Sequence, residues 1–178
     1  MDFEILHRQV MYQGRILKVE NVAVRLPGDR QAHYDLIVHE NSVSMLPLDE
    51  SGRIWMVSQY RLGAEGMLLE LPAGTANHGE DPQHCALREL REEIGMAAGR
   101  LEKLGEMYLA PGYSDEYMYV YLATDLNPDP LKADEDEYLQ VEKLPVSQVY
   151  QMVAEGQIHD SKTLAALLMA EPYLRAYR

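Results

Sequence analysis

Residues 74–96 of this 178-residue chain read Gly74-Thr-Ala-Asn-His-Gly-Glu80-Asp-Pro-Gln-His-Cys-Ala-Leu-Arg88-Glu89-Leu-Arg-Glu92-Glu93-Ile-Gly95-Met96. Residues three and four apart are neighbours on a helix, so Glu89, Glu92 and Glu93 share one stripe. Carboxylates this close repel one another unless a cation neutralises them. Mg²⁺ prefers oxygen ligands and typically links one or two carboxylates to substrate phosphates. The stretch therefore predicts a divalent-metal site that binds a phosphorylated substrate.

The helix that carries these glutamates has recognisable start and stop signals. Asp81 is placed to cap its N-terminus, and Pro82 suits the first helical position. Gly95 is placed to close it. An apolar stripe runs beside the glutamates and consists of Ala86, Leu90 and Ile94. The pattern predicts a helix that begins at Pro82 and buries one face.

The spacing of these residues resembles the signature of the Nudix hydrolases. That signature is Gly, five residues, Glu, seven residues, then Arg-Glu-apolar-any-Glu-Glu-any-Gly-apolar. The positions are filled by Gly74, Glu80, Arg88, Glu89, Leu90, Glu92, Glu93, Gly95 and Met96. A solvated acidic helix face is the alternative, and the complete spacing disfavours it. The resemblance implies an α/β (α+β) fold, namely an α/β/α sandwich with a mixed central sheet.

Outside residues 74–96 the chain resembles the ADP-ribose pyrophosphatase branch, which includes other nucleoside-diphosphate-sugar hydrolases. Three segments carry this likeness: Gln59-Tyr60-Arg61, Leu69-Glu-Leu-Pro-Ala-Gly74 and Pro111-Gly-Tyr-Ser-Asp-Glu116. Two departures are Ala110, where that branch usually has serine, and His33-Tyr-Asp35, where it often has basic residues. The likeness implies metal-dependent cleavage of a diphosphate linkage, with ADP-ribose as the first candidate substrate. GDP-mannose or another nucleoside diphosphate sugar is the alternative, and a non-catalytic ligand sensor is the second.

The resemblance also implies roles for the residues of the signature. Glu89, Glu93 and the main-chain carbonyl of Ala73 are expected to bind Mg²⁺, for which Mn²⁺ is a substitute. Glu92 is expected to bind the metal or support its ligands, and so to take part in catalysis. Roles in shaping the motif are expected for Gly74, Glu80, Arg88 and Gly95, with Arg88 orienting the glutamates.

The base that activates water is expected in the acidic loop at residues 133–137. Aligning the strand that starts at Leu139 with the family strand puts Glu135 at the base position and Glu137 at a further metal-ligand position. The alternative for each of these carboxylates is a solvated loop, which is the usual fate of a run of acidic residues.

Candidate substrate contacts lie in two other segments. Arg61 is expected to bind the diphosphate, because a guanidinium fork suits phosphate oxygens. A surface salt bridge is its alternative role. Glu116 is expected to accept hydrogen bonds from ribose hydroxyls. Candidates for stacking on a nucleobase are Tyr12, Tyr34 and Tyr113, although a tyrosine more often simply packs.

Hydrophobic alternation and turn residues predict the other elements. Strands are expected at residues 9–12, 16–24, 33–39, 42–48, 54–60, 68–71, 104–109, 116–123 and 139–142, and two further helices at 146–155 and 161–170. We expect residues 1–35 to form an N-terminal β element and residues 36–178 the Nudix domain. By resemblance, the N-terminal element joins two subunits in a homodimer; its alternative is an extension of the same sheet.

Composition narrows the class of protein further. A net charge of −13 disfavours nucleic-acid binding, which relies on Lys and Arg to displace counterions. The same negative charge does not exclude a diphosphate substrate, because a metal ion bound with it offsets the repulsion. No run of 18 apolar residues and no basic-then-apolar leader is seen, so neither a membrane partner nor a signal peptide is expected. The single cysteine, Cys85, fits a cytoplasmic location and a packed thiol.

Overall fold

The computed structural model describes residues 2–132 and 138–177 and contains ten strands and four α-helices within them. The strands are β1 (Glu4–Gln13), β2 (Leu17–Leu26), β3 (Arg30–His39), β4 (Ser42–Pro47), β5 (Arg53–Arg61), β6 (Gly66–Glu70), β7 (Ala73–Thr75), β8 (Met96–Tyr108), β9 (Tyr117–Pro128) and β10 (Leu139–Pro145). The helices are α1 (Pro82–Glu93), α2 (Val146–Ala154), α3 (Ser161–Met169) and α4 (Glu171–Leu174), with short 3₁₀ turns at Leu62–Ala64 and Arg175–Tyr177.

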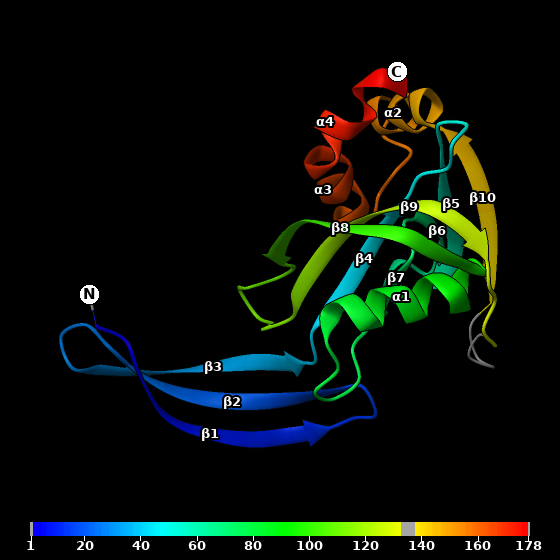
Figure 1. Cartoon of the computed structure of the whole chain (residues 1–178). Coiled ribbons are helices and arrows are strands. Elements are labelled where there is room, and N and C mark those ends of the chain that lie inside the picture. Colours follow the sequence, from blue (N-terminus) through cyan, green and yellow to red (C-terminus); the bar gives the residue numbers. More distant parts are fainter. Residues whose placement is uncertain (1, 133–137, 178) are drawn as a thin grey trace.

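These strands form three sheets. The central one is mixed, in the order β7-β4-β9-β8, because β4 pairs with β9 in parallel and the other pairs are antiparallel. A second, antiparallel sheet has the order β10-β5-β6. The third contains β1, β2 and β3 and extends away from the rest of the molecule as an arm (Figure 1). The mixed central sheet and the separate N-terminal antiparallel element confirm the fold class predicted from the sequence.

Helices cover both faces of the central sheets, which explains why β4 is buried along its whole length. Successive strand residues point to opposite faces. Val43 and Met45 pack in one core with Leu90 of α1, whereas Leu46 packs in the other with Leu167 of α3. Strands β5 and β9 divide their side chains in the same way. The sandwich therefore has two apolar layers, with α1 on one side and α2 to α4 on the other (Figure 1).

Helix α1 begins and ends where the sequence predicts. The Asp81 carboxylate accepts hydrogen bonds from the backbone N–H groups of Gln83 and His84, a cap that contributes about 1 kcal/mol. The helix ends at Glu93, and Gly95 adopts a φ of +69°, which costs a glycine little. The chain then turns directly into β8.

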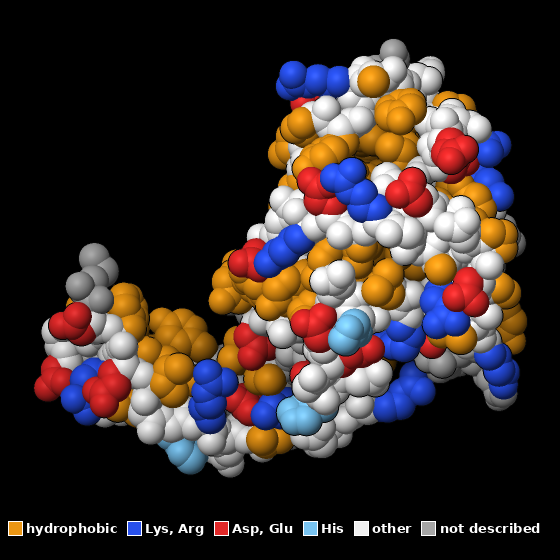
Figure 2. All heavy atoms as spheres, viewed as in Figure 1, with side chains coloured by type: hydrophobic (Ala, Val, Ile, Leu, Met, Phe, Trp, Pro, Cys, Tyr) orange, Lys and Arg blue, Asp and Glu red, His pale blue; other side chains and the backbone are white. Residues whose placement is uncertain are grey.

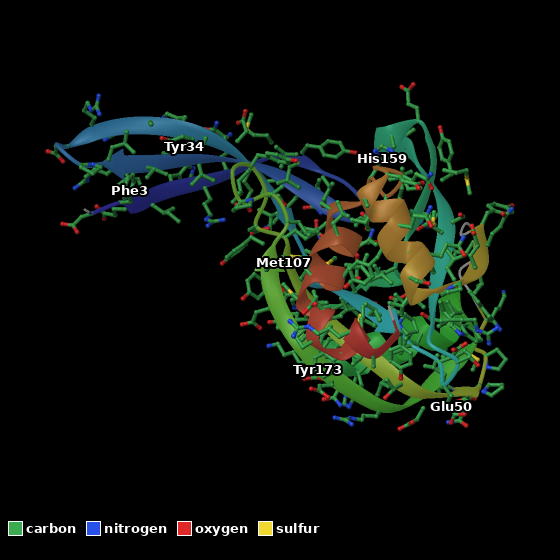
Figure 3. The ribbon with its side chains drawn as sticks, turned by 90° about the horizontal axis from the view of Figure 1, so that it is seen from above. Phe3, Tyr34, Glu50, Met107, His159 and Tyr173 are labelled. Carbon is green, nitrogen blue, oxygen red and sulfur yellow. The ribbon has the colours of Figure 1, made fainter. Side chains whose placement is uncertain are left out.

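The arm carries an unusual amount of exposed apolar surface. Its exposed residues, all between half and two-thirds accessible, are Phe3, Ile5, Val10, Met11, Tyr12, Ile16 and Tyr34. Figure 2 shows hydrophobic side chains gathered where the arm faces the body, and Figure 3 shows Phe3 and Tyr34 well away from Tyr173 and Glu50. The strand β3 runs without a break to His39, so it crosses the boundary expected at residue 35.

Two strands differ in length from the sequence prediction. Strand β8 begins at Met96, not near residue 104, because residues with weak strand preference pair with β9 from Met96 onward. Strand β1 covers ten residues rather than four, and bulges interrupt its pairing with β2. Its largely exposed side chains give it no regular apolar alternation, so only the pairing with β2 defines its length.

Candidate active site

Arg88 on α1 holds three carboxylates of the signature together. Its Nη1 donates to Glu89 Oε1 at 2.7 Å and to Glu92 Oε2 at 2.7 Å. Its Nε and Nη2 donate to the two carboxylate oxygens of Glu80 at 3.1 and 3.0 Å. One guanidinium therefore sets the directions of Glu80, Glu89 and Glu92, which is the geometry that an orienting role for Arg88 requires.

Glu80 ties the loop before α1 to this cluster. Hydrogen bonds from Arg88, assisted by the backbone N–H of Asn77, outweigh the effect of burial and lower the pKa of Glu80 to about 2. The carboxylate is thus ionised at any pH at which the protein is expected to work. Of its partners, Asn77 precedes the Asp81 cap in the sequence and Arg88 follows it. Glu80 therefore ties the loop before α1 to the helix itself.

Strand β7 lies against the glutamate face of α1. The backbone N–H of Ala73 donates to Glu93 Oε2 at 3.0 Å. Both Glu93 and Glu89 are buried, with 6% and 8% of their surface exposed. Gly74 lies within β7 without a positive φ, and a Cβ atom there would lie 2.0 Å from Glu89 Cδ. The glycine leaves the space that the Glu89 carboxylate fills.

The donor set at this place is suited to a hard divalent cation. Glu89, Glu92 and Glu93 offer only oxygen atoms, and β7 brings the Ala73 backbone to the same helix face. Within residues 2–132 and 138–177, no group of three His, Cys, Asp or Glu side chains is arranged so that it could hold a metal ion. Glu89 and Glu92 accept from Arg88, and Glu93 accepts from the Ala73 backbone. Glu135 and Glu137 lie outside the described residues.

Two neighbouring cavities open beside this cluster. One, of about 600 Å³, is lined by Arg88, Glu89, Glu92 and residues 73–78. The other, of about 350 Å³, is lined by residues that include His39, Glu116 and Lys162. Five residues line both: Ile16, Arg61, Ala73, Gly74 and Thr75. A molecule that occupies both cavities would therefore lie along this shared lining, which includes Arg61.

Arg61 lies at this junction but is paired with a carboxylate. Its Nε donates to Glu70 Oε1 at 2.7 Å and its Nη2 to Glu70 Oε2 at 3.0 Å. The Glu70 side chain is 1% exposed, whereas that of Arg61 is 39% exposed. The salt bridge weighed from the sequence therefore exists, although it joins Arg61 to a buried glutamate. Arg61 nevertheless lines both cavities.

Glu116 also lies where a substrate is able to reach it. The loop before it is held to the end of β3, because Ile37 N donates to Tyr113 O at 2.7 Å and His39 N to Asp115 Oδ1 at 2.9 Å. Of the described residues that line the two cavities, none is a tyrosine. The three stacking candidates, Tyr12, Tyr34 and Tyr113, are exposed elsewhere.

Several polar residues at the second cavity were not predicted from the sequence. They are His39, Asp160 and Lys162, together with Glu70 beneath Arg61. Glu70 is flanked by Leu69 and Leu71 in an apolar strand, and this charge in a core position was a signal that the sequence offered. Lys162 gave none, because a lysine in the first turn of a helix is usually solvated.

The prediction of a packed cysteine is matched by the structure. Cys85 is a buried free thiol, and burial is the main cause that raises its pKa to about 12, which confirms a packed rather than a reactive cysteine. None of the helices in the described residues is long and apolar enough to cross a bilayer.

Known proteins resemble this chain over most of its length. Residues 38–167 match the model of the NUDIX domain. A relative from Bacillus subtilis (strain 168), named ADP-ribose pyrophosphatase, is 30% identical over 169 residues, which cover 94% of this chain and 91% of the relative. One with the same name from Mycobacterium tuberculosis (strain ATCC 25618 / H37Rv) is 35% identical over 170 residues, 94% of this chain and 82% of that one. A GDP-mannose pyrophosphatase from Yersinia pestis (strain Pestoides F) is 35% identical over 132 residues, 68% of this chain and 66% of the relative.

The fold has a close counterpart among solved structures. The crystal structure of an ADP compounds hydrolase superposes with a TM-score of 0.87 at 24% identity and covers 99% of this chain and 96% of that one. Nudix hydrolases generally need a divalent metal ion, which agrees with the oxygen-rich face of α1. With the domain matched over residues 38–167 and relatives of at least 30% identity along nearly its whole length, the chain belongs to the Nudix hydrolase family.

Proposed function

We propose that this enzyme hydrolyses the diphosphate linkage of a nucleoside diphosphate sugar, with ADP-ribose cleaved to AMP and ribose 5-phosphate in the presence of Mg²⁺ or Mn²⁺. One observation carries the proposal. Glu89 and Glu92, both hydrogen-bonded to Arg88, line a cavity that shares Arg61 and part of β7 with a second cavity. Relatives named ADP-ribose pyrophosphatase share nearly the whole chain with it.

The chain's own residues can be given distinct tasks in this reaction. Glu89, Glu93, Glu92 and the Ala73 carbonyl would hold the metal, and Glu137 would add a ligand. When bound, the metal supplies Lewis acidity at the phosphoryl oxygens and lowers the pKa of coordinated water. Arg61 presents its exposed guanidinium edge to the diphosphate. Glu116, which lines the second cavity, accepts hydrogen bonds from a ribose.

Glu135 is our candidate for the base that takes a proton from the attacking water. The described residues on both sides of its loop support this choice. Leu131 N donates to Arg91 O at 3.0 Å, next to Glu92, and Leu139 pairs with Gln59, two residues before Arg61. In the sequence, residues 133–137 therefore join a segment bonded next to Glu92 to a strand that pairs two residues before Arg61.

Replacing Glu135 with glutamine is expected to lower kcat by about 10²–10⁴-fold, because general-base catalysis contributes that much. Glu137→Gln, a matched change two residues away, is expected to raise the Mg²⁺ concentration needed for half-maximal rate. Both effects are measured by steady-state kinetics over a Mg²⁺ titration. A normal kcat in Glu135→Gln together with a collapsed kcat in Glu137→Gln would assign the base to Glu137.

The substrate assignment is tested by following hydrolysis with ³¹P NMR. ADP-ribose and GDP-mannose are incubated separately with the protein and Mg²⁺, and again with EDTA. Faster, EDTA-sensitive release of AMP and ribose 5-phosphate supports the proposal. Faster cleavage of GDP-mannose, the substrate in the name of the Yersinia pestis relative, would keep the reaction and replace the sugar. No cleavage of either would favour another diphosphate substrate or a ligand sensor.

We also propose that two subunits associate through the arm. Seven apolar side chains exposed on β1 to β3 and the connections beside them would be covered by a second copy. The test is sedimentation velocity of Met11→Glu, which places a charge on an apolar residue that is 61% exposed, beside Leu168→Glu, which does so on α3 at a residue 76% exposed. A dimer that only Met11→Glu disrupts supports the arm; a monomeric unmodified protein would refute it.

The proposal includes a cytoplasmic location. Its support is the single cysteine, Cys85, which is a buried free thiol. A chain with one packed thiol has no structural use for an oxidising compartment. Fractionation of cells that produce the protein from its own gene would test this.

A further inference from the structure

A lysine is buried in the first turn of α3, at the edge of the second cavity. Lys162 is 8% exposed, and its Nζ donates to Asp160 Oδ1 at 2.9 Å and to Glu70 Oε2. Asp160 is the N-cap of α3 and follows His159, which Figure 3 labels. Lysines are almost never fully buried unless paired. Both partners of Lys162 are carboxylates, so its burial is compensated.

Glu70 connects this lysine to Arg61. Glu70 Oε2 accepts from both Lys162 Nζ and Arg61 Nη2, while Glu70 Oε1 accepts from Arg61 Nε. Four charged side chains thus form a linear ion-pair network from the N-terminus of α3 to the residues shared by the two cavities. In order, they are Asp160, Lys162, Glu70 and Arg61. Two of these side chains are cations and two are anions, so the network is neutral as a whole.

The charge balance of this ion-pair network affects Arg61 directly. Two cations share the single negative charge of Glu70, so Arg61 is only partly neutralised and retains attraction for an added phosphate. Without the ammonium, the same four positions would carry one net negative charge. Among the described residues, Arg61 would then be the one remaining hydrogen-bonded cation of Glu70, and its attraction for a phosphate at the junction would be weaker.

Helix α3 also has docking contacts that do not involve the lysine. Thr163 Oγ1 accepts from Leu71 N at 2.8 Å and donates to Asp160 Oδ2 at 2.6 Å. Ala166 and Leu167 of α3 are buried in the core with Leu71. The helix is therefore attached to the segment after Glu70 by neutral residues as well as by the ion pair of Lys162.

We propose that Lys162 is a positioning residue for substrate binding: it shares Glu70 with Arg61 and so keeps the Arg61 guanidinium available to the diphosphate. This inference rests on the proposed function, because it requires a diphosphate at Arg61. It assigns to α3 a part in substrate affinity, while the glutamates of α1 carry the chemistry.

The test is a double-mutant cycle between Lys162→Met and Arg61→Met. Lys162→Gln is a second variant that also removes the charge, and Lys162→Arg keeps it. Lys103→Met is the matched control, because it removes an equal charge and an ion pair with Glu106 on β8, away from both cavities. KM and kcat are measured on the sugar nucleotide that is cleaved. The Kd of inorganic pyrophosphate with Mg²⁺ is measured by calorimetry, and melting curves show which variants are folded.

Lys162→Met and Lys162→Gln are expected to raise KM and the pyrophosphate Kd by about tenfold, the effect of about 1.4 kcal/mol, with little change in kcat. Lys162→Arg and Lys103→Met should stay close to the unmodified protein. In the Arg61→Met background, the second substitution should change KM by less than about twofold, because coupled residues are not additive.

Several results would overturn this inference. They are an unchanged KM in both neutral variants, an equal loss of kcat, additive effects in the cycle, or an unmodified protein that does not bind pyrophosphate. Failure of the proposed function is a separate result. If neither sugar nucleotide is cleaved, the pyrophosphate titration still decides whether Lys162 acts through Arg61.

Discussion

Replacing Glu93 with glutamine is expected to lower kcat by at least about a hundredfold. Glu93 is buried, and its Oε2 accepts a hydrogen bond from the Ala73 backbone at 3.0 Å. Glutamine has the same shape and keeps an oxygen for that hydrogen bond, but it removes the negative charge. The loss would therefore come from weaker metal binding and not from a changed fold.

The measurement is kcat at saturating substrate over a Mg²⁺ titration, with calorimetric Mg²⁺ binding as a readout independent of turnover. Glu50→Gln is a suitable control, because Glu50 is exposed in the turn before β5 and lines neither of the two cavities at the site. The control should match the unmodified protein, and both variants should show the same melting temperature. If Glu93→Gln kept its rate and its Mg²⁺ affinity, Glu93 would have no place in the metal site.

Local signals in the sequence were enough for the elements around this glutamate. Asp81 and Pro82 define the start of α1 because capping is a property of a few adjacent residues. Gly95 defines its end for the same reason. The stripe of Glu89, Glu92 and Glu93 follows from helical periodicity alone, so the acidic face of α1 was predictable without any knowledge of the sheets.

Other parts of the site depend on contacts between distant residues. Lys162 and Glu70 are 92 residues apart, and their pairing exists only because α3 packs beside the end of β6. Strand β7 has three residues, too few for a periodic pattern, and β4 defines it by pairing. The three tyrosine candidates were chosen by residue type alone, and none of them lines either of the two cavities. Long-range pairing thus decides which charges meet.

Gly74→Ala is expected to produce the other large effect, a loss of kcat of at least about a hundredfold. A Cβ at position 74 would lie 2.0 Å from Cδ and 2.1 Å from Oε1 of Glu89. Gly74 is held in place by pairing with Val43, and Glu89 is held by Arg88 at 2.7 Å. The glutamate must therefore rotate away or β7 must move, and either change separates Glu89 from its cluster. Overpacking of this kind costs about 1–3 kcal/mol of stability.

The comparison variant is Gly63→Ala, because a Cβ at Gly63 meets no atom within 4 Å. Activity, Mg²⁺ affinity and the free energy of unfolding are measured for both. Adding Glu89→Asp to Gly74→Ala separates the two consequences of the clash. The shorter side chain relieves the contact and should restore stability, but it withdraws the carboxylate from the site, so activity should stay low. Recovery of activity in the double variant would mean that space at Gly74, and not the position of the Glu89 carboxylate, limits the reaction.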